Sequence, residues 1–220
     1  AIEQTFGGQM HSVTLNEVVR SSQRIVEGAR AFQTDDDDAP TTCQHNAVGP
    51  PLRSILFGKA LDGVTRSQTY AARVVEALRF VMSKFPGLTL HDRVGIVVPD
   101  DRFIAKGGPF MHALAPQGTS TVNGKRFQFS DATEANKAVS SPSSLSSSGA
   151  TVQTLVLDTV DNFNGLERLI VIAVGLDEVI GEETSRTRSR LYRAITRAQM
   201  VVVVVNEVLK GGWLEFLTRV

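Results

Sequence analysis

The sequence predicts a three-layer α/β domain in which helices flank both faces of a mostly parallel sheet. Continuous apolar runs such as Leu169–Val174 and Val201–Val205 suit strands buried on both faces, because β-branched side chains pack well on a pleated surface. Stretches with helical periodicity alternate with these runs, which is the order typical of parallel sheets with right-handed crossovers. With 220 residues the chain can bury one sizeable core, so we predict a single domain over residues 1–220.

Two amphipathic helices are predicted in the first half of the chain. One follows a short strand at Ser12–Leu15 and continues to about Phe32, and the other spans Ser67–Phe85 before Pro86 and Gly87. Residues 41–67 are predicted to be irregular because glycine and proline interrupt them. The apolar stripes at helical spacing are Val18, Val19, Ile25, Val26 and Ala29 in the first helix and Tyr70, Val74, Val75, Leu78, Val81 and Met82 in the second.

The remaining elements are shorter. Further strands are predicted at Arg93–Val98, Arg126–Phe129 and Val152–Leu157. Further helices are predicted at Phe103–Ala115, with a break at Gly107–Pro109, and at Asp131–Val139 with Asp131 as the N-cap. Residues 140–150 are rich in serine and are predicted to be a flexible loop inside the domain.

The last part of the chain carries an arginine-rich segment. Residues 177–188 are predicted to be a charged loop, and the helix after it precedes the valine strand. Arg186, Arg190, Arg193 and Arg197 are spaced four, three and four apart, so a helix would place them on one face, either as a solvated basic surface or to hold a phosphate. A final helix is predicted from Val208, with Trp213, Leu214 and Leu217 on its inner side.

Composition excludes several classes of protein. Lys plus Arg and Asp plus Glu balance at 23 each, so no global field draws the chain to a polyanion. Cys43 is the only cysteine, which rules out an internal disulfide framework and a thiolate metal site. With neither a signal peptide nor a membrane-length apolar run, we expect an intracellular protein, cytoplasmic or nuclear. Ala1 in place of an initiator Met indicates a fragment of a longer chain or a processed product.

Parallel sheets of this kind place ligand sites at the carboxyl ends of their strands. We therefore expect a ligand site where segments follow predicted strands. These segments are Arg20, Asp100–Asp101, residues 159–167 and the residues that lead to Arg197. Asp100 and Asp101 follow an apolar strand, as magnesium-holding acids do in ATPases. In one interpretation these two acids bind a metal ion in a stand-alone enzyme. In the other they only form an acidic turn at the end of the strand.

Three segments together carry a resemblance to a known family. They are residues 15–25 (LNEVVRSSQRI), residues 159–167 (TVDNFNGLE) and residues 191–198 (LYRAITRA), and an apolar strand follows each of the last two. In this order they resemble motifs four, five and six of the second RecA-like lobe of superfamily-one helicases, in the UvrD-like and RNA-decay branches. The resemblance covers about residues 15–206 and implies a RecA-like sheet of the P-loop NTPase type.

The resemblance implies roles at an ATP site between two lobes. Arg20 and Arg197 would be the arginines that reach the γ-phosphate, where preplaced positive charge stabilises the transition state. Glu167 would accept a hydrogen bond from the nucleotide sugar, and Gly165 would permit close approach of the backbone. Gln4 would be the tail of motif three. Each also has a structural interpretation: Arg197 pairs with Glu167 or Asp177, Arg20 braces its helix, and Gly165 only forms a turn.

The resemblance also implies contact with single-stranded nucleic acid. Thr159 would position a backbone phosphate through its hydroxyl, together with Asp161 and Asn162 of the same loop. Some residues depart from the family pattern. Val19 stands where an aromatic residue often stacks on the base, and Asp161 and Asn164 stand where the UvrD-like branch often carries His and Lys.

A phosphate-binding loop is missing from the sequence. No stretch reads G-x-x-x-x-G-K-[ST], so ATP and Mg²⁺ would be held mainly by a separate N-terminal lobe, which is the expected partner. We predict that this chain alone does not hydrolyse ATP. The alternative function is a non-catalytic helicase-like module for interaction or regulation, which the neutral charge and Val19 favour.

Overall fold

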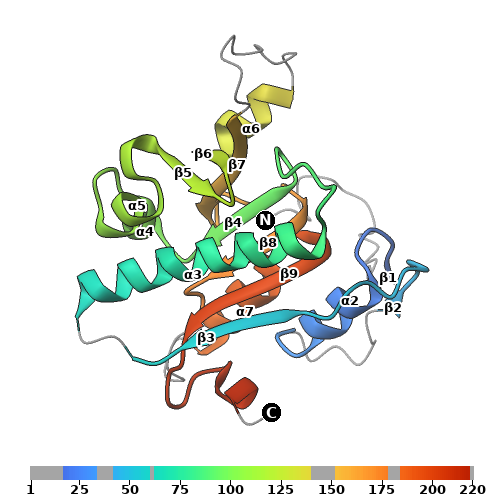
Figure 1. Cartoon of the computed structure of the whole chain (residues 1–220). Helices are drawn as coiled ribbons and strands as arrows, with labels where there is room; N and C mark the ends of the chain where they lie inside the picture. Colours follow the sequence, from blue (N-terminus) through green and yellow to red (C-terminus); the bar gives the residue numbers. More distant parts are fainter. Residues whose placement is uncertain (1–16, 34–41, 60–61, 140–151, 178–183, 219–220) are drawn as a thin grey trace, which may run out of the picture.

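A computed structural model describes residues 17–33, 42–59, 62–139, 152–177 and 184–218 (Figure 1). The strands are β1 Glu17–Val18, β2 Thr42–Cys43, β3 Arg53–Phe57, β4 Val94–Val98, β5 Thr119–Val122, β6 Lys125–Ser130, β7 Val152–Thr159, β8 Arg168–Val174 and β9 Ala198–Glu207. The helices are α2 Gln23–Arg30, α3 Gly63–Lys84, α4 Asp101–Ile104, α5 Pro109–Leu114, α6 Ala132–Val139 and α7 Thr184–Ile195, with 3₁₀ turns η1 Pro116–Gly118 and η2 Glu215–Thr218.

A seven-stranded sheet in the order β3-β9-β8-β4-β7-β6-β5 forms the centre of the domain. All neighbouring strands are parallel except β5 and β6, which form an antiparallel hairpin at one edge. β1 and β2 form a separate two-stranded parallel sheet. The predicted α/β class with a mostly parallel sheet is therefore confirmed.

Helices cover both faces of the sheet, as Figure 1 shows for α3 in front and α7 behind. The core on one face joins α3 and α5 to Val201, Val203 and Val205, whereas the core on the other face joins α2, α6 and α7 to Val202 and Val204. All five valines are buried, because alternate side chains of β9 enter opposite layers. The valine run therefore forms the doubly covered strand that the sequence predicted.

Helix α3 confirms the second predicted helix and extends it at the start. Asp62 is the N-cap, and its carboxylate accepts a hydrogen bond from the Thr65 backbone N–H at 2.8 Å. Tyr70, Val74 and Val81 on its inner face are fully buried. The predicted interruption at Gly107–Pro109 is also confirmed, because α4 ends before it and α5 begins at Pro109.

Several elements differ from the prediction. The structure places β2 and β3 inside the stretch predicted to be irregular and adds β5 as the partner of β6. The first helix begins at Gln23, so Val18 lies in β1 and Val19 is 66% exposed instead of lying on an apolar helical stripe. The arginine helix α7 begins at Thr184, inside the predicted charged loop, and ends at Ile195 before Arg197.

The helix predicted from Val208 is wrong among the described residues. The segment turns at Gly211, whose φ of 78° favours glycine, and the only helical turn in it is η2. The buried Asp177 carboxylate accepts hydrogen bonds from the backbone N–H groups of Trp213 and Leu214 at 2.8 and 2.9 Å. These bonds fix the segment against the sheet without a helix.

Several predictions fall outside the described residues: Gln4, the strand Ser12–Leu15 and the loop over residues 140–150. Within the described part of the chain, no helix is both long and apolar enough to cross a membrane.

Gly95 in β4 makes room for the loop between β7 and β8. A Cβ at this position would lie 2.4 Å from Cζ of Phe163, which is fully buried. We expect Gly95→Ala to lower the free energy of unfolding by about 1–3 kcal/mol, because the ring must shift in a packed layer. Urea denaturation would measure this change, with Gly87→Ala as the control, since a Cβ at Gly87 meets no atom within 4 Å. Equal stability of the two variants would contradict the prediction.

Candidate functional site

Arg20 and Arg197 line one cavity of about 360 Å³, although they lie near opposite ends of the chain. The segment from Glu17 to Ser21 forms one wall, α2 forms the second, and the end of α7 with Thr196 forms the third. The other lining residues are Val18, Val19, Ile25, Val26, Ala29, Arg30, Gln33 and Tyr192. We call this space the arginine cavity.

Three hydrogen bonds to backbone carbonyls bring the two arginines together. The Ser21 hydroxyl donates to the Ala198 carbonyl at 2.9 Å, and the Ser22 N–H donates to the Gln199 carbonyl at 2.9 Å. The Arg168 N–H donates to the Arg197 carbonyl at 3.0 Å. All three predicted motifs therefore meet beside the start of β9, since Arg168 directly follows residues 159–167.

The site lies at the opposite edge of the sheet from the one predicted. Arg168 and Ala198 are paired at the beginning of β8 and β9, so Glu167 and Arg197 sit at the amino ends of these strands. The prediction of a site at the carboxyl ends is wrong because Arg197 precedes its strand and Arg20 follows β1, which belongs to the small sheet. Asp100 lies at the carboxyl end of β4 and takes no part in the cavity.

Arg20 forms an ion pair with Glu167, with 2.6 Å between Nη1 and Oε1. The Arg20 side chain is 59% exposed and that of Glu167 is 20% exposed, so solvent screens the pair and its contribution to stability is small. The pair instead fixes the direction of the Arg20 guanidinium. Glu167 therefore braces Arg20, and no ion pair joins it to Arg197 among the described residues.

Arg197 is held beside other positive charges. Burial lowers the pKa of its guanidinium, and the charge of Arg20 lowers that pKa further, with a smaller effect of the same sign from Arg193. Glu167 and Tyr192 act in the opposite direction. The Arg197 Nε is buried and has no hydrogen-bond partner among the described residues. An anion in the cavity would reduce the repulsion between the arginines.

Arg193 holds the loop over residues 159–167. Its guanidinium donates to Asp161 Oδ1 at 2.8 Å, to Asn164 Oδ1 at 2.9 Å and to the Val160 carbonyl at 3.2 Å. Asp161 and Asn164 are thus the two side-chain acceptors for this arginine. The segment over residues 191–198 therefore fixes the shape of the loop over residues 159–167 through one residue.

The residues predicted to contact nucleic acid form a turn with one another. Thr159 is buried, and its hydroxyl accepts from the Asn162 N–H at 3.2 Å. The Asn162 side chain donates to Oδ1 of the buried Asp158 at 2.8 Å. Asp161 remains 65% exposed although Arg193 contacts it. Nucleic-acid contact by Thr159, Asp161 and Asn162 stays a prediction.

Gly165 is exposed and has a φ of 82°, a conformation that favours glycine. A Cβ added at this position would meet no atom within 4 Å, so the turn alone accounts for the glycine in this structure. Its predicted approach to a nucleotide stays a prediction.

The acidic turn after β4 caps a helix. Asp100 is the N-cap of α4, and its carboxylate accepts from the Arg102 N–H at 2.9 Å. No group of three His, Cys, Asp or Glu side chains within the described ranges could hold a metal ion. The observed contact of Asp100 is therefore that of an acidic turn at the start of a helix.

The sequence did not identify the walls of the arginine cavity. Tyr192 and Thr196 are one helical turn apart at the end of α7, and Ile25, Ala29 and Gln33 follow the same spacing along and just beyond α2. This four-residue spacing is visible in the sequence. The spacing looks like that of a core stripe because Ile25 and Ala29 are apolar. Both side chains are buried, and both also line the arginine cavity.

No protein-family model matches the sequence, and the search of curated proteins finds no match. Among solved structures, the fold is similar to the C-terminal domain of a possible DNA helicase from Lactobacillus plantarum WCFS1. The two share 15% sequence identity over 86% of this chain and 87% of that chain, with a TM-score of 0.47.

Proposed function

We propose that this chain is the C-terminal RecA-like lobe of an ATP-dependent nucleic-acid helicase or translocase, which supplies Arg20 and Arg197 to ATP held mainly by a separate N-terminal lobe. The observation that carries the proposal is the arginine cavity, in which two guanidinium groups from distant motifs share about 360 Å³. The Arg20–Glu167 pair at 2.6 Å and the motif order support the same assignment.

The electrostatics of the cavity favour a compact anion. Arg20 destabilises the charged form of Arg197, and Glu167 offsets this only in part. A terminal phosphate carries the opposite charge and presents oxygens that match a guanidinium fork. A guanidinium is a permanent cation, so both side chains would be in place before charge develops on the transferring phosphoryl group.

The remaining parts of an ATP site are assigned to the N-terminal lobe. The sequence has no G-x-x-x-x-G-K-[ST] stretch, and this loop cradles the phosphates and places Mg²⁺ in the enzymes that carry it. When bound, the metal ion would neutralise charge on the phosphate oxygens. Within this chain, Glu167 directs Arg20, and Tyr192 and Thr196 form the wall next to Arg197.

Titration of the isotope-labelled chain with ATP tests the proposal. We expect weak binding, and we expect the amide NMR resonances of Arg20, Glu167 and residues 192–197 to shift most. Arg197→Gln should weaken this binding about tenfold, which corresponds to the loss of one charged hydrogen-bonded contact. Lys106→Gln removes an exposed cation that lies outside the cavity and should leave binding unchanged.

A phosphate-release assay on the isolated chain completes the test. With single-stranded nucleic acid present, we expect no turnover of ATP, because this chain provides no phosphate loop. Turnover that disappears in Arg197→Ala would contradict the assignment of ATP to a separate lobe. ATP-dependent shifts confined to residues outside the arginine cavity would contradict the site itself.

A further inference from the structure

A second recess lies on the face of the sheet that α3 covers. It has a volume of about 190 Å³ and is located where α3 ends and β3 and β9 begin. Most of its lining is apolar, and the two cations Arg53 and Lys84 border it. The apolar lining residues are Pro50, Pro51, Leu52, Phe80, Phe85 and Val201.

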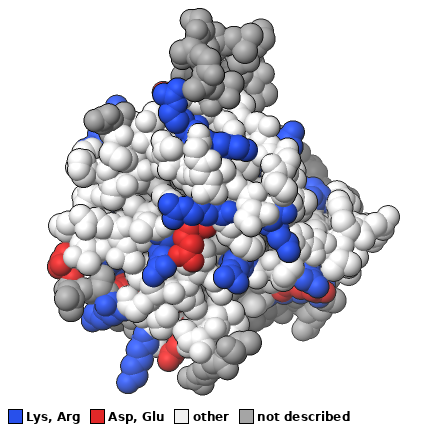
Figure 2. Space-filling model, viewed as in Figure 1, with Lys and Arg blue, Asp and Glu red and all other residues white. Residues whose placement is uncertain are grey.

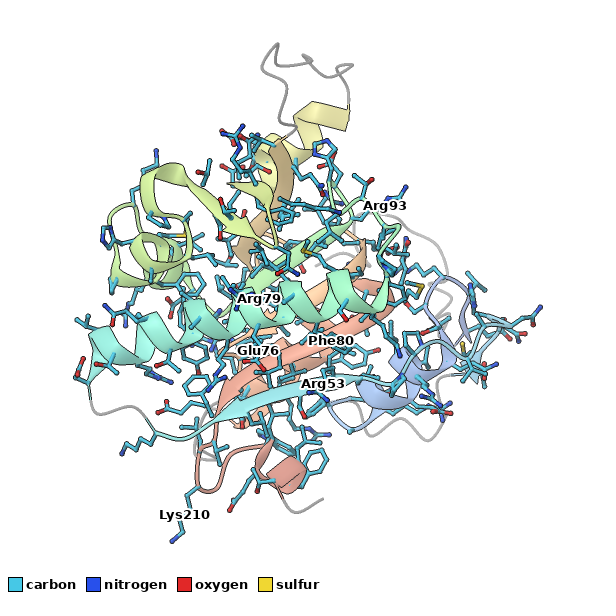
Figure 3. The ribbon with its side chains drawn as sticks, in the orientation of Figure 1. Arg53, Glu76, Arg79, Phe80, Arg93 and Lys210 are labelled. Carbon is cyan, nitrogen blue, oxygen red and sulfur yellow. The ribbon has the colours of Figure 1, made fainter. Side chains whose placement is uncertain are left out.

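Unpaired cations lie at this recess and near it. Figure 3 shows Arg79 and Phe80 on α3, Arg53 on β3 and Arg93 beyond the end of the helix. The Arg53 guanidinium lies 5.5 Å from the centre of the Phe80 ring. In the described part of the chain, no ion pair engages the cations at positions 53, 79, 84 and 93.

Nearby acids neutralise this face only in part. Glu76 is already paired with Arg73 at 2.6 Å, and Asp92 is 3.1 Å from His91. Figure 2 shows the resulting pattern, in which Lys and Arg side chains gather across the middle of the face around a small acidic area. The positive charge is therefore local, because the whole chain is neutral.

The chemistry of this surface matches single-stranded nucleic acid. Proteins that bind single strands combine cations along the backbone path with aromatic or guanidinium surfaces that contact exposed bases. The recess supplies the apolar surface of Phe80 and Phe85 beside the Arg53 plane, and the unpaired cations extend on both sides of Phe80. Duplex DNA hides its bases and would use the cations alone.

We propose that the basic recess, defined as the cavity bordered by Arg53, Phe80 and Lys84 together with the cations Arg79 and Arg93 outside it, binds single-stranded nucleic acid. One base enters the recess, and the adjacent phosphates contact the cations. The surface differs from the predicted strand contacts, because Thr159 ends β7 at the carboxyl edge whereas Arg53 begins β3 at the amino edge. It also faces away from the arginine cavity, whose walls are α2 and α7.

Fluorescence anisotropy with a labelled oligothymidine about 12 nucleotides long tests the proposal across a salt series. Arg79→Gln and Lys84→Gln together should lower the steepness of the salt dependence by about 1.4, since each lost phosphate contact removes about 0.7 from the slope of log K against log salt. The matched control is Lys210→Gln, an exposed cation that Figure 3 shows far from the recess. The control should leave affinity and slope unchanged.

The base contact has its own variant. Phe80→Leu keeps an apolar side chain in the partly buried position but removes the ring, and we expect affinity to fall about tenfold. Circular dichroism would establish that the variant is folded. A second substitution, Arg53→Gln, removes the guanidinium plane without changing the core and should weaken binding in the same direction.

Three results would overturn the proposal. They are failure of the wild-type chain to bind the oligothymidine in low salt, an unchanged salt slope in the Arg79 and Lys84 double variant, and displacement of the strand by an acidic peptide at lower concentration than by unlabelled oligothymidine. Arg197→Gln should bind the strand normally. Loss of strand binding in that variant would place the strand in the arginine cavity and not in the basic recess. The experiment therefore tests the basic recess separately from the proposed ATP site.

Discussion

Replacing Arg197 with alanine is expected to slow ATP hydrolysis by a factor of about 10³–10⁵ in a protein that joins this chain to a lobe carrying a phosphate loop. Arg197 has a buried Nε without a partner among the described residues, and its charge is held beside that of Arg20. The barrier should rise because this guanidinium no longer meets the charge that develops on the phosphoryl oxygens. Steady-state phosphate release would measure the rate.

Arg197→Lys is the companion variant. It keeps the positive charge and loses the planar fork, so we expect a rate between those of the wild type and the alanine variant. Equal rates for wild type and Arg197→Ala would contradict a catalytic role. A folded two-lobe protein that hydrolyses no ATP at all would instead favour the alternative, a non-catalytic interaction or regulatory module.

Replacing Asp177 with alanine is expected to lower the free energy of unfolding by about 2–5 kcal/mol. Asp177 is only 1% exposed, and its carboxylate accepts the backbone N–H groups of Trp213 and Leu214. The alanine variant leaves both donors without this acceptor, and Leu214 is itself buried. Urea denaturation at neutral pH would measure the loss.

Asp62→Ala provides the comparison for Asp177. Asp62 also accepts a backbone N–H, from Thr65 at 2.8 Å, but it caps α3 at an exposed position. Water can replace an exposed cap, so we expect a smaller loss than in Asp177→Ala. If the two variants lost equal stability, Asp177 would not be the main anchor of the C-terminal segment.

The central layers of the fold could be predicted because their residues leave few alternatives. Val201–Val205 can bury five branched side chains only between two covered faces, and Tyr70, Val74 and Val81 recur at helical spacing. Edge elements were less predictable. β3 at the edge begins with exposed Arg53 and partly exposed Ser54 and follows two prolines, so its short pattern resembles a loop.

The two ends of the described chain were mispredicted because tertiary contacts decide their shape. Val18 and Val19 continue an apolar stripe in the sequence, yet the Ser21 and Ser22 bonds to the start of β9 delay the helix until Gln23. Likewise, Asp177 lies far from Trp213 along the chain, so its capture of that segment has no local pattern in the sequence.

The sequence pointed to three residues that meet in space, but not to the place where they meet. Residues 15–25, 159–167 and 191–198 supplied Arg20, Glu167 and Arg197, and the structure brings these three together. Their role toward a nucleotide stays a prediction. The sequence placed these residues at the carboxyl ends of the strands, whereas Glu167 and Arg197 lie at the amino ends of β8 and β9. The rule that ligands bind at the carboxyl ends applies to segments that follow strands of the main sheet. The role of Arg193 as a clamp on Asp161 and Asn164 required the spatial contact itself.

A double-mutant cycle on ATP binding is the most direct measurement of whether Arg20 and Arg197 serve one ligand. The dissociation constants of the wild type, Arg20→Gln, Arg197→Gln and the double variant would be compared by NMR titration. We predict that each single substitution raises the dissociation constant for ATP. We also predict that the factor for the double variant differs clearly from the product of the two single factors, because groups that contact one phosphate are coupled. Binding that is unaffected by either substitution, or losses that multiply independently, would contradict a shared phosphate in the arginine cavity.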